Sequence, residues 1–91
     1  MLRELGDLAG ARTQLERAVK IGEAALGPDH LTMANIHSNL GIVLRDLGDL
    51  AGAKASFQRA IAIDEAVHGR DHPTVATDRR NLDLVLRVLG E

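Results

Sequence analysis

The chain has 91 residues, 45% hydrophobic and 26% charged, so it can bury a core and does not have the composition of a disordered segment. Its formal net charge of −2 offers no basic surface for nucleic acid, and the lack of cysteine excludes disulfides, thiol nucleophiles and thiolate metal sites. No apolar run approaches the roughly 18 residues that cross a bilayer, and the start MLRELGDLAGA is too charged for a signal peptide. We therefore expect a cytoplasmic protein with neither a membrane nor a nucleic acid as partner.

One phrase occurs twice, 42 residues apart. Residues 2–11 read LRELGDLAGA and residues 44–53 read LRDLGDLAGA. Aligning residues 2–49 on residues 44–91 without a gap gives about 26 identities in 48 positions. Such self-similarity over the whole length predicts an array of two units. We expect LGDLAGA to be the turn that joins the two helices of each unit, and to recur because the unit recurs.

The period divides the chain into units 2–43 and 44–85, with an overhang of 86–91. Neither unit can bury its apolar face alone, so the units must stack, and we expect one repeat domain over residues 1–91. The chain begins inside one repeat and ends after the first helix of another. We therefore expect a fragment of a longer array.

Apolar side chains recur with helical spacing from the start of the chain. The first predicted helix covers 8–26, and residues 1–5 read as the tail of a truncated helix. Leu8, Leu15 and Val19 lie on one side of that first helix. We expect them to pack against the second.

The second predicted helix covers 30–47. Its apolar stripe follows spacings of four, three, one and three residues and consists of Ile36, Leu40, Val43, Leu44 and Leu47. Gly48 then ends the helix, because glycine adopts positive φ without strain. Asp49 stands at the N-cap of the next helix.

The third predicted helix covers 50–68 and stops near Gly69. Phe57, the single Phe, Trp or Tyr residue, is expected in the core between helices. Small residues on both partners let these helices approach closely; they are Gly41, Ala53 and Ala60. Asp64 is the one polar member of the apolar side of this helix.

The fourth predicted helix covers 72–89, with Asp71 or His72 as its cap and Pro73 in its first turn. Its apolar stripe has no following helix to cover it and consists of Leu82, Val85, Leu86 and Leu89. Its polar positions suggest a partial end cap and are Asp78, Arg79, Arg80 and Asp83. Since the uncovered stripe matches a surface that accepts a helix inside the chain, we expect weak head-to-tail association between copies. No segment alternates with period two, so no strand is predicted.

Several of these residues follow a known pattern: Leu40–Gly41, Leu44, Gly48, Ala53, Phe57 and Ala60. The pattern resembles the tetratricopeptide repeat, and the 42-residue period with its GPDH and GRDHPTVA linkers resembles the kinesin-light-chain type found in bacterial multi-repeat proteins. The resemblance implies an all-α fold of about four helices, in antiparallel helix-turn-helix units stacked as a right-handed α-solenoid. His37 departs from the pattern, which has a large apolar or aromatic residue there, and Asp83 replaces the small residue found at Gly41.

No constellation of residues indicates an enzyme, a metal site or a cofactor. His30 and His72 each follow an aspartate in a linker, where capping is the simpler role. His68 and His72 are four apart, but a predicted helix break separates them, so we expect no structural metal. His37 is expected to pack beside the core with its polar atoms satisfied. It cannot activate its neighbour Ser38, because adjacent helical residues point about 100° apart.

Two polar residue types recur at repeat positions. Arginine occupies one of them as Arg3, Arg45 and Arg87, and asparagine another as Asn39 and Asn81. In the resembling family this helix lines the inner, concave surface, where asparagine can bond a peptide main chain and arginine can pair with carboxylates. The candidate peptide-binding residues are Ser38, Asn39, Arg45, Arg80, Asn81 and Arg87.

Two functions from different classes remain open at this point. The first is a protein-interaction scaffold that binds a peptide or partner segment on the concave face. The second is a structural spacer or self-associating array without a specific ligand. For the recurring residues themselves the alternative role is structural: the arginines only solvate the surface, pairing with Asp46 or Asp49, and asparagine bonds the neighbouring helix.

Overall fold

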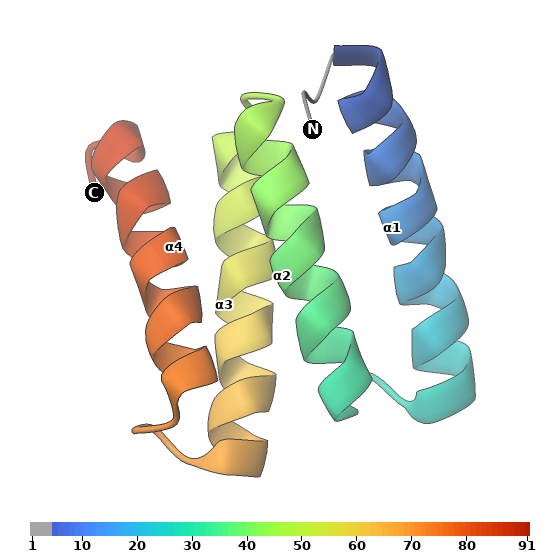
Figure 1. Ribbon diagram of the computed structural model, residues 1–91, viewed down its shortest axis with the longest axis vertical. Helices are drawn as coiled ribbons and strands as arrows, with labels where there is room; N and C mark the ends of the chain where they lie inside the picture. The colour runs from blue at the N-terminus through green and yellow to red at the C-terminus, as the bar shows by residue number, and fades with distance from the viewer. Residues whose placement is uncertain (1–4) are drawn as a thin grey trace.

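Residues 5–91 of the computed structural model form four α-helices (Figure 1). They are α1 (Leu5–Leu26), α2 (Leu31–Asp46), α3 (Leu50–His68) and α4 (Pro73–Leu89). Each helix runs antiparallel to the one before it and packs against it, and α2 also touches α4 (Figure 1). This described part contains no strand, and its order of contacts is that of stacked helical repeats, as predicted.

The helix boundaries follow the local signals in the sequence. The helix predicted over 50–68 is confirmed residue for residue, and those over 30–47 and 72–89 are confirmed to within one residue at each end. None of the described helices is long and apolar enough to cross a lipid bilayer.

The repeated phrase LGDLAGA adopts two different structures. Residues 47–53 turn from α2 into α3, as predicted, whereas residues 5–11 lie inside α1, so the prediction of a turn there was wrong. In the second copy the helix ends at Gly48, whose φ is 88°. The chain then reverses, so that α3 packs against α2. In the first copy α1 begins at Leu5, three residues before the predicted start at residue 8, and runs through the whole phrase. Of the tail expected at residues 1–5, all but Leu5 lies outside the described residues.

Four glycines spaced 21 residues apart follow the four helices. Their φ values are 90° at Gly27, 88° at Gly48, 87° at Gly69 and 78° at Gly90. Only glycine takes such values without strain, so the glycine at each position stops the helix and lets the chain reverse. The stops predicted at Gly48 and Gly69 are confirmed.

The helices α2 and α4 each have a histidine as N-cap residue. The Nδ1 atoms of His30 and His72 accept hydrogen bonds from the backbone N–H groups of Thr32 and Thr74, both at 3.1 Å. The cap of α4 is therefore His72 rather than Asp71. At α3 the cap is Asp49, as predicted, whose Oδ1 accepts from the N–H of Gly52 at 2.9 Å.

Replacing Asp49 with Ala should lower the free energy of unfolding by about 1 kcal/mol, because the N–H of Gly52 loses its acceptor. Urea denaturation followed by circular dichroism measures the change. Asp71→Ala is the matched control, since Asp71 is exposed and does not cap α4. Equal effects of the two substitutions would contradict the cap.

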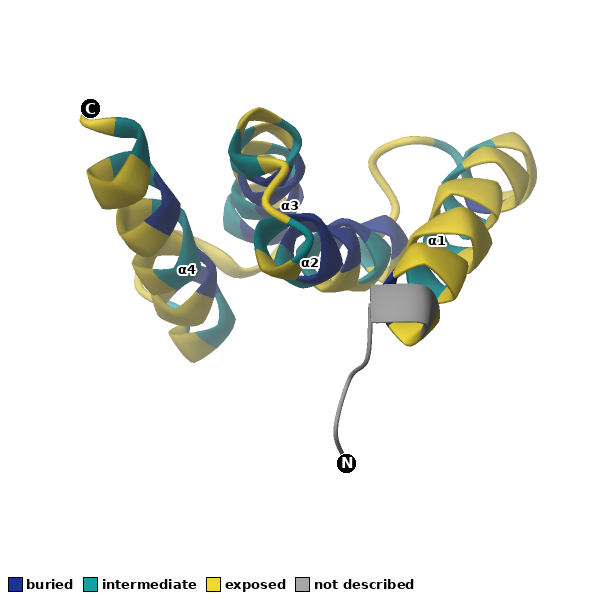
Figure 2. Ribbon diagram, turned by 90° about the horizontal axis from the view of Figure 1, so that it is seen from above, coloured by how far each residue is buried: buried dark blue, intermediate teal, exposed yellow. Residues whose placement is uncertain are grey.

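The main core cluster joins α2, α3 and α4. Its buried members are Leu40, Leu44, Ala53, Phe57 and Val85. Phe57 is 0% exposed, and a Cβ built on Gly41 would lie 2.7 Å from its ring, so the predicted close approach is confirmed. In Figure 2 the buried positions of α2 and α3 face each other at the centre of the stack.

The first helix packs as expected. Leu8 is 7% exposed, and Leu15 and Val19 are half-buried against the core. Val19 also touches a second cluster, which consists of Met33, Ala34 and Ile63. The contacts of α1 are made with α2.

The prediction of an uncovered stripe on α4 was wrong. Val85 is 0% exposed, and Leu82 and Leu89 pack against the main core. The exposed apolar side chains of α4 are instead Leu84 and Val88, at 46% and 69%. The stripe is covered from the inside, because α3 and α2 both contact α4.

Candidate functional site

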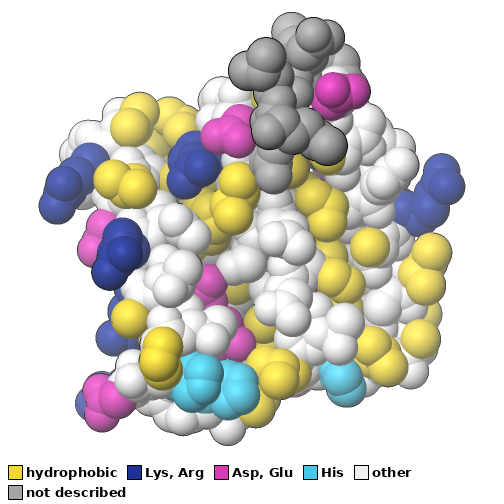
Figure 3. Space-filling view, in the orientation of Figure 1, with side chains coloured by type: hydrophobic (Ala, Val, Ile, Leu, Met, Phe, Trp, Pro, Cys, Tyr) yellow, Lys and Arg dark blue, Asp and Glu magenta, His cyan; other side chains and the backbone are white. Residues whose placement is uncertain are grey.

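The six residues predicted to bind a peptide all lie on α2 and α4, and we call the solvent-exposed side of these two helices the α2–α4 face. Asn39, Arg80 and Arg87 are exposed, and Ser38, Arg45 and Asn81 are half-buried. In Figures 1 and 2, α2 lies nearer the viewer of Figure 1 than α3 does. Figure 3 shows cationic side chains gathered over the α4 side of this view. Arg3, the first arginine of the predicted row, lies outside the described residues.

Two of the six residues are engaged within the chain. The Nε of Arg45 lies 3.4 Å from Oδ1 of Asp46, which is the surface pairing weighed as the alternative role. The Ser38 hydroxyl donates to Oδ1 of Asp78 at 2.6 Å and so ties α2 to α4. Ser38 therefore has a structural partner that the sequence analysis did not identify.

Asp78 itself is 3% exposed, so its prediction as a polar position of an end cap was wrong. Asp64 of α3 is buried as well, at 2% exposed. The pKa of Asp78 is raised to about 6, first by burial and next by the neighbouring Asp64 carboxyl, while the bond from Ser38 opposes the rise. A signal for this cluster exists in the repeat: Gly22 and Ile36 occupy the positions that Asp64 and Asp78 occupy one period later.

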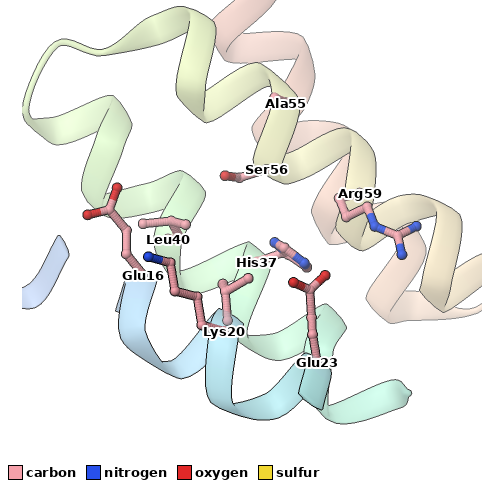
Figure 4. A pocket seen from close by; sticks show the side chains of 9 residues that line it. Glu16, Lys20, Glu23, His37, Leu40, Ala55, Ser56 and Arg59 are labelled. Atoms are coloured by element: carbon pink, nitrogen blue, oxygen red, sulfur yellow. The ribbon is translucent and has the colours of Figure 1, made fainter. Parts of the chain in front are cut away.

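A groove of about 620 Å³ lies between α1 and α3, with α2 as its floor, and we call it the α1–α3 groove. Figure 4 shows side chains from all three helices around it. It is lined by Glu16, Val19, Lys20, Glu23, His37, Leu40, Ala55, Ser56 and Arg59. None of the six predicted residues is among them, and sequence periodicity gave no signal for this groove.

His37 lies at the floor of the α1–α3 groove, between Glu23 and Arg59 (Figure 4). It is 9% exposed, which confirms that it packs, but its Nε2 has no hydrogen-bond partner among the described residues, so the expectation of a satisfied side chain was wrong. Burial lowers the pKa of His37 below 6.5, the Arg59 charge lowers it further, and Glu23 opposes both. Arg59 is held in place by Pro28 O and Asp29 Oδ1, both at 3.0 Å.

The imidazole of His37 should therefore titrate below pH 6.5. Because the folded state disfavours the proton, the neutral ring contributes stability above pH 6.5 that is lost as pH falls through the folded pKa. An NMR titration of the His37 ring protons measures the midpoint directly, with His37→Gln to assign the signals. A midpoint at or above 6.5 would contradict the buried, unpaired ring.

The remaining histidines support structural roles. The rings of His68 and His72 stack at 4.0 Å between centroids, with 17° between their planes. Within residues 5–91 no group of three or more His, Cys, Asp or Glu side chains could hold a metal ion. The expectation that no metal affects the fold stays a prediction.

Comparison with known proteins identifies the repeat. The family model described as tetratricopeptide repeat matches residues 1–66 and, in a second overlapping match, residues 32–90. The two matches together span nearly the whole chain. No curated protein matches it. The match does not distinguish the kinesin-light-chain type, which stays a prediction.

Proposed function

The chain belongs to the tetratricopeptide repeat family, and from this premise we propose that it is a scaffold that binds an extended, carboxylate-bearing segment of a partner protein on the α2–α4 face. Repeats of this family generally mediate protein–protein interactions, and the family is one of non-catalytic scaffolds. Both statements favour a protein as the partner over a small substrate.

The choice of the α2–α4 face is based on three exposed polar side chains. The side chains of Asn39, Arg80 and Arg87 are exposed and form no hydrogen bond or ion pair with any other described residue. Arg80 and Arg87 are seven positions apart, so they share one face of α4. Their guanidinium groups are available for carboxylates, and the amide of Asn39 can bond a peptide main chain.

Selection from a displayed peptide library, followed by affinity measurement with the selected peptide, tests this proposal. The double variant Arg80→Glu/Arg87→Glu should weaken binding by at least roughly tenfold, because attraction becomes repulsion. Lys20→Glu is the matched control, since Lys20 lines the α1–α3 groove and lies outside the α2–α4 face. An unchanged affinity of the double variant, or a loss confined to Lys20→Glu, would contradict the proposal.

Self-association is the second candidate, and the exposed apolar side chains of α4 favour it. Leu84 and Val88 are 46% and 69% exposed on α4, and Ile21 is 62% exposed on α1. A contact of α4 with α1 of the next copy would be heterologous and would continue into chains of molecules. Sedimentation over a wide concentration range should then show a rising mass that Val88→Lys abolishes. A constant monomeric mass up to millimolar protein would rule this out.

A further inference from the structure

The contact between α1 and α2 and the contact between α3 and α4 have different side chains at the same repeat positions. Where α1 meets α2, a Cβ built on Gly22 would lie 2.6 Å from Sδ of Met33 and 3.6 Å from Cδ1 of Ile36, so this contact is tight and apolar. One period later, where α3 meets α4, the positions of Gly22 and Ile36 are taken by Asp64 and Asp78. Both of these residues are buried, at 2% and 3% exposed. Two acids have thus replaced an apolar pair inside a contact between helices.

Only one of the two carboxylate oxygens of Asp78 has a hydrogen-bond partner among the described residues. Oδ1 accepts from the hydroxyl of Ser38 on α2 at 2.6 Å. Oδ2 is buried and has no hydrogen-bond partner among the described residues. Asp64 of α3 is the neighbouring side chain, and two ionised carboxylates cannot bond each other because neither has a donor. A proton on either carboxyl would supply the missing hydrogen bond.

We propose that the docking of α4 on α2 and α3 is governed by one proton that Asp78 holds beside the buried Asp64, so that α4 is held firmly in mildly acidic solution and loosens when the proton leaves. Two unprotonated carboxylates would repel each other inside a dry contact, where neither is solvated. The contact of α1 with α2 lacks this device, since it has Gly22 and Ile36 in their place. This inference does not depend on the proposed binding function.

The charged groups around the pair do not neutralise it. From α2, Asp78 faces the uncharged Ser38, while the adjacent His37 lies in the α1–α3 groove between Glu23 and Arg59. The α3 side contributes Asp64 and, at the exposed edge, Glu65, which is paired with Arg79 of α4. That ion pair engages Arg79. Neither Asp64 nor Asp78 forms an ion pair with a residue that the structure describes.

The direction of the pH effect follows from the raised pKa of Asp78, about 6 against an ordinary value of 3.8. The folded state binds the proton more tightly than the undocked state. Its contribution is therefore fully present below pH 3.8 and is lost as pH rises through about 6. Between pH 5 and pH 7.5 these two values correspond to about a tenfold loss in the docking equilibrium.

Amide hydrogen exchange at residue resolution, corrected for the intrinsic pH dependence of exchange, tests the proposal. In the natural chain, protection of α4 should fall about tenfold from pH 5 to pH 7.5, whereas protection of α1 should not fall. Asp78→Asn keeps the acceptor for Ser38 and can donate to Asp64, so its α4 protection should stay constant. The double variant Asp64→Gly/Asp78→Ile copies the apolar contact and should also remove the pH dependence.

Two results would overturn the inference. One is equal α4 protection at pH 5 and pH 7.5 in the natural chain. The other is a fall in Asp78→Asn as large as that in the natural chain. Asp78→Asn decides the matter by itself if the double variant does not fold, because its side chain has nearly the same shape as the original.

Discussion

Replacing Phe57 with Ala is expected to lower the free energy of unfolding by roughly 3–5 kcal/mol, the largest effect of any single substitution considered. The ring is 0% exposed and belongs to the cluster that joins α2, α3 and α4. Its removal would leave a cavity at the meeting point of three helices. A loss of this size is a large fraction of the 5–15 kcal/mol typical of a folded domain.

Urea denaturation followed by circular dichroism measures this loss. Leu15→Ala is the matched control, because Leu15 occupies the repeat position of Phe57 on α1 but is only half-buried. Leu15→Ala should lower the free energy of unfolding clearly less. Phe57→Leu should lower it by an intermediate amount, and it serves in place of Phe57→Ala if that variant does not fold. A loss below about 1 kcal/mol for Phe57→Ala would show that the ring does not fill the core.

Replacing Gly41 with Ala should destabilise the protein by about 1–3 kcal/mol, although alanine is the better helix former. The new Cβ would meet three atoms of the Phe57 ring at 2.7, 2.9 and 2.9 Å, closer than packed atoms approach. At Gly10, also inside a helix, a Cβ would meet nothing within 4 Å. Gly10→Ala should therefore stabilise the protein by about 0.5–1 kcal/mol.

Gly41→Ala and Gly10→Ala are thus expected to change the free energy of unfolding in opposite directions. The double variant Gly41→Ala/Phe57→Leu should lose less free energy of unfolding than the sum of the two single changes, since the two residues are in contact. The same denaturation experiment measures all four variants. A gain in stability from Gly41→Ala would contradict the close approach of α2 and α3.

The sequence predicted what depends on local signals. The caps at His30, Asp49 and His72 and the glycine stops lie within a few residues of the helix ends that they determine, so the helices could be located closely. Helical spacing also shows which side chains share a face. It does not show which neighbour covers that face, and for this reason the stripe on α4 was predicted to be uncovered although Val85 is buried and Leu82, Leu86 and Leu89 are half-buried.

The errors at the site have the same origin. Asp78 was read as a solvated charge because its partners are distant in the chain, Ser38 forty residues before it and Asp64 on the preceding helix. The α1–α3 groove arises from the placement of α1 and α3 on either side of α2, which no local pattern encodes. Comparison of the two repeats could have revealed the exchange of Gly22 and Ile36 for two acids.

An NMR titration with a peptide from the displayed library tests most directly the claim that the α2–α4 face binds a partner segment. Amide shifts in the labelled protein report which helices the peptide contacts. We expect the largest changes to cluster around Asn39, Arg80 and Arg87 and to weaken at high salt. Changes centred instead on Glu16, Lys20 and Arg59 of the α1–α3 groove would contradict this expectation.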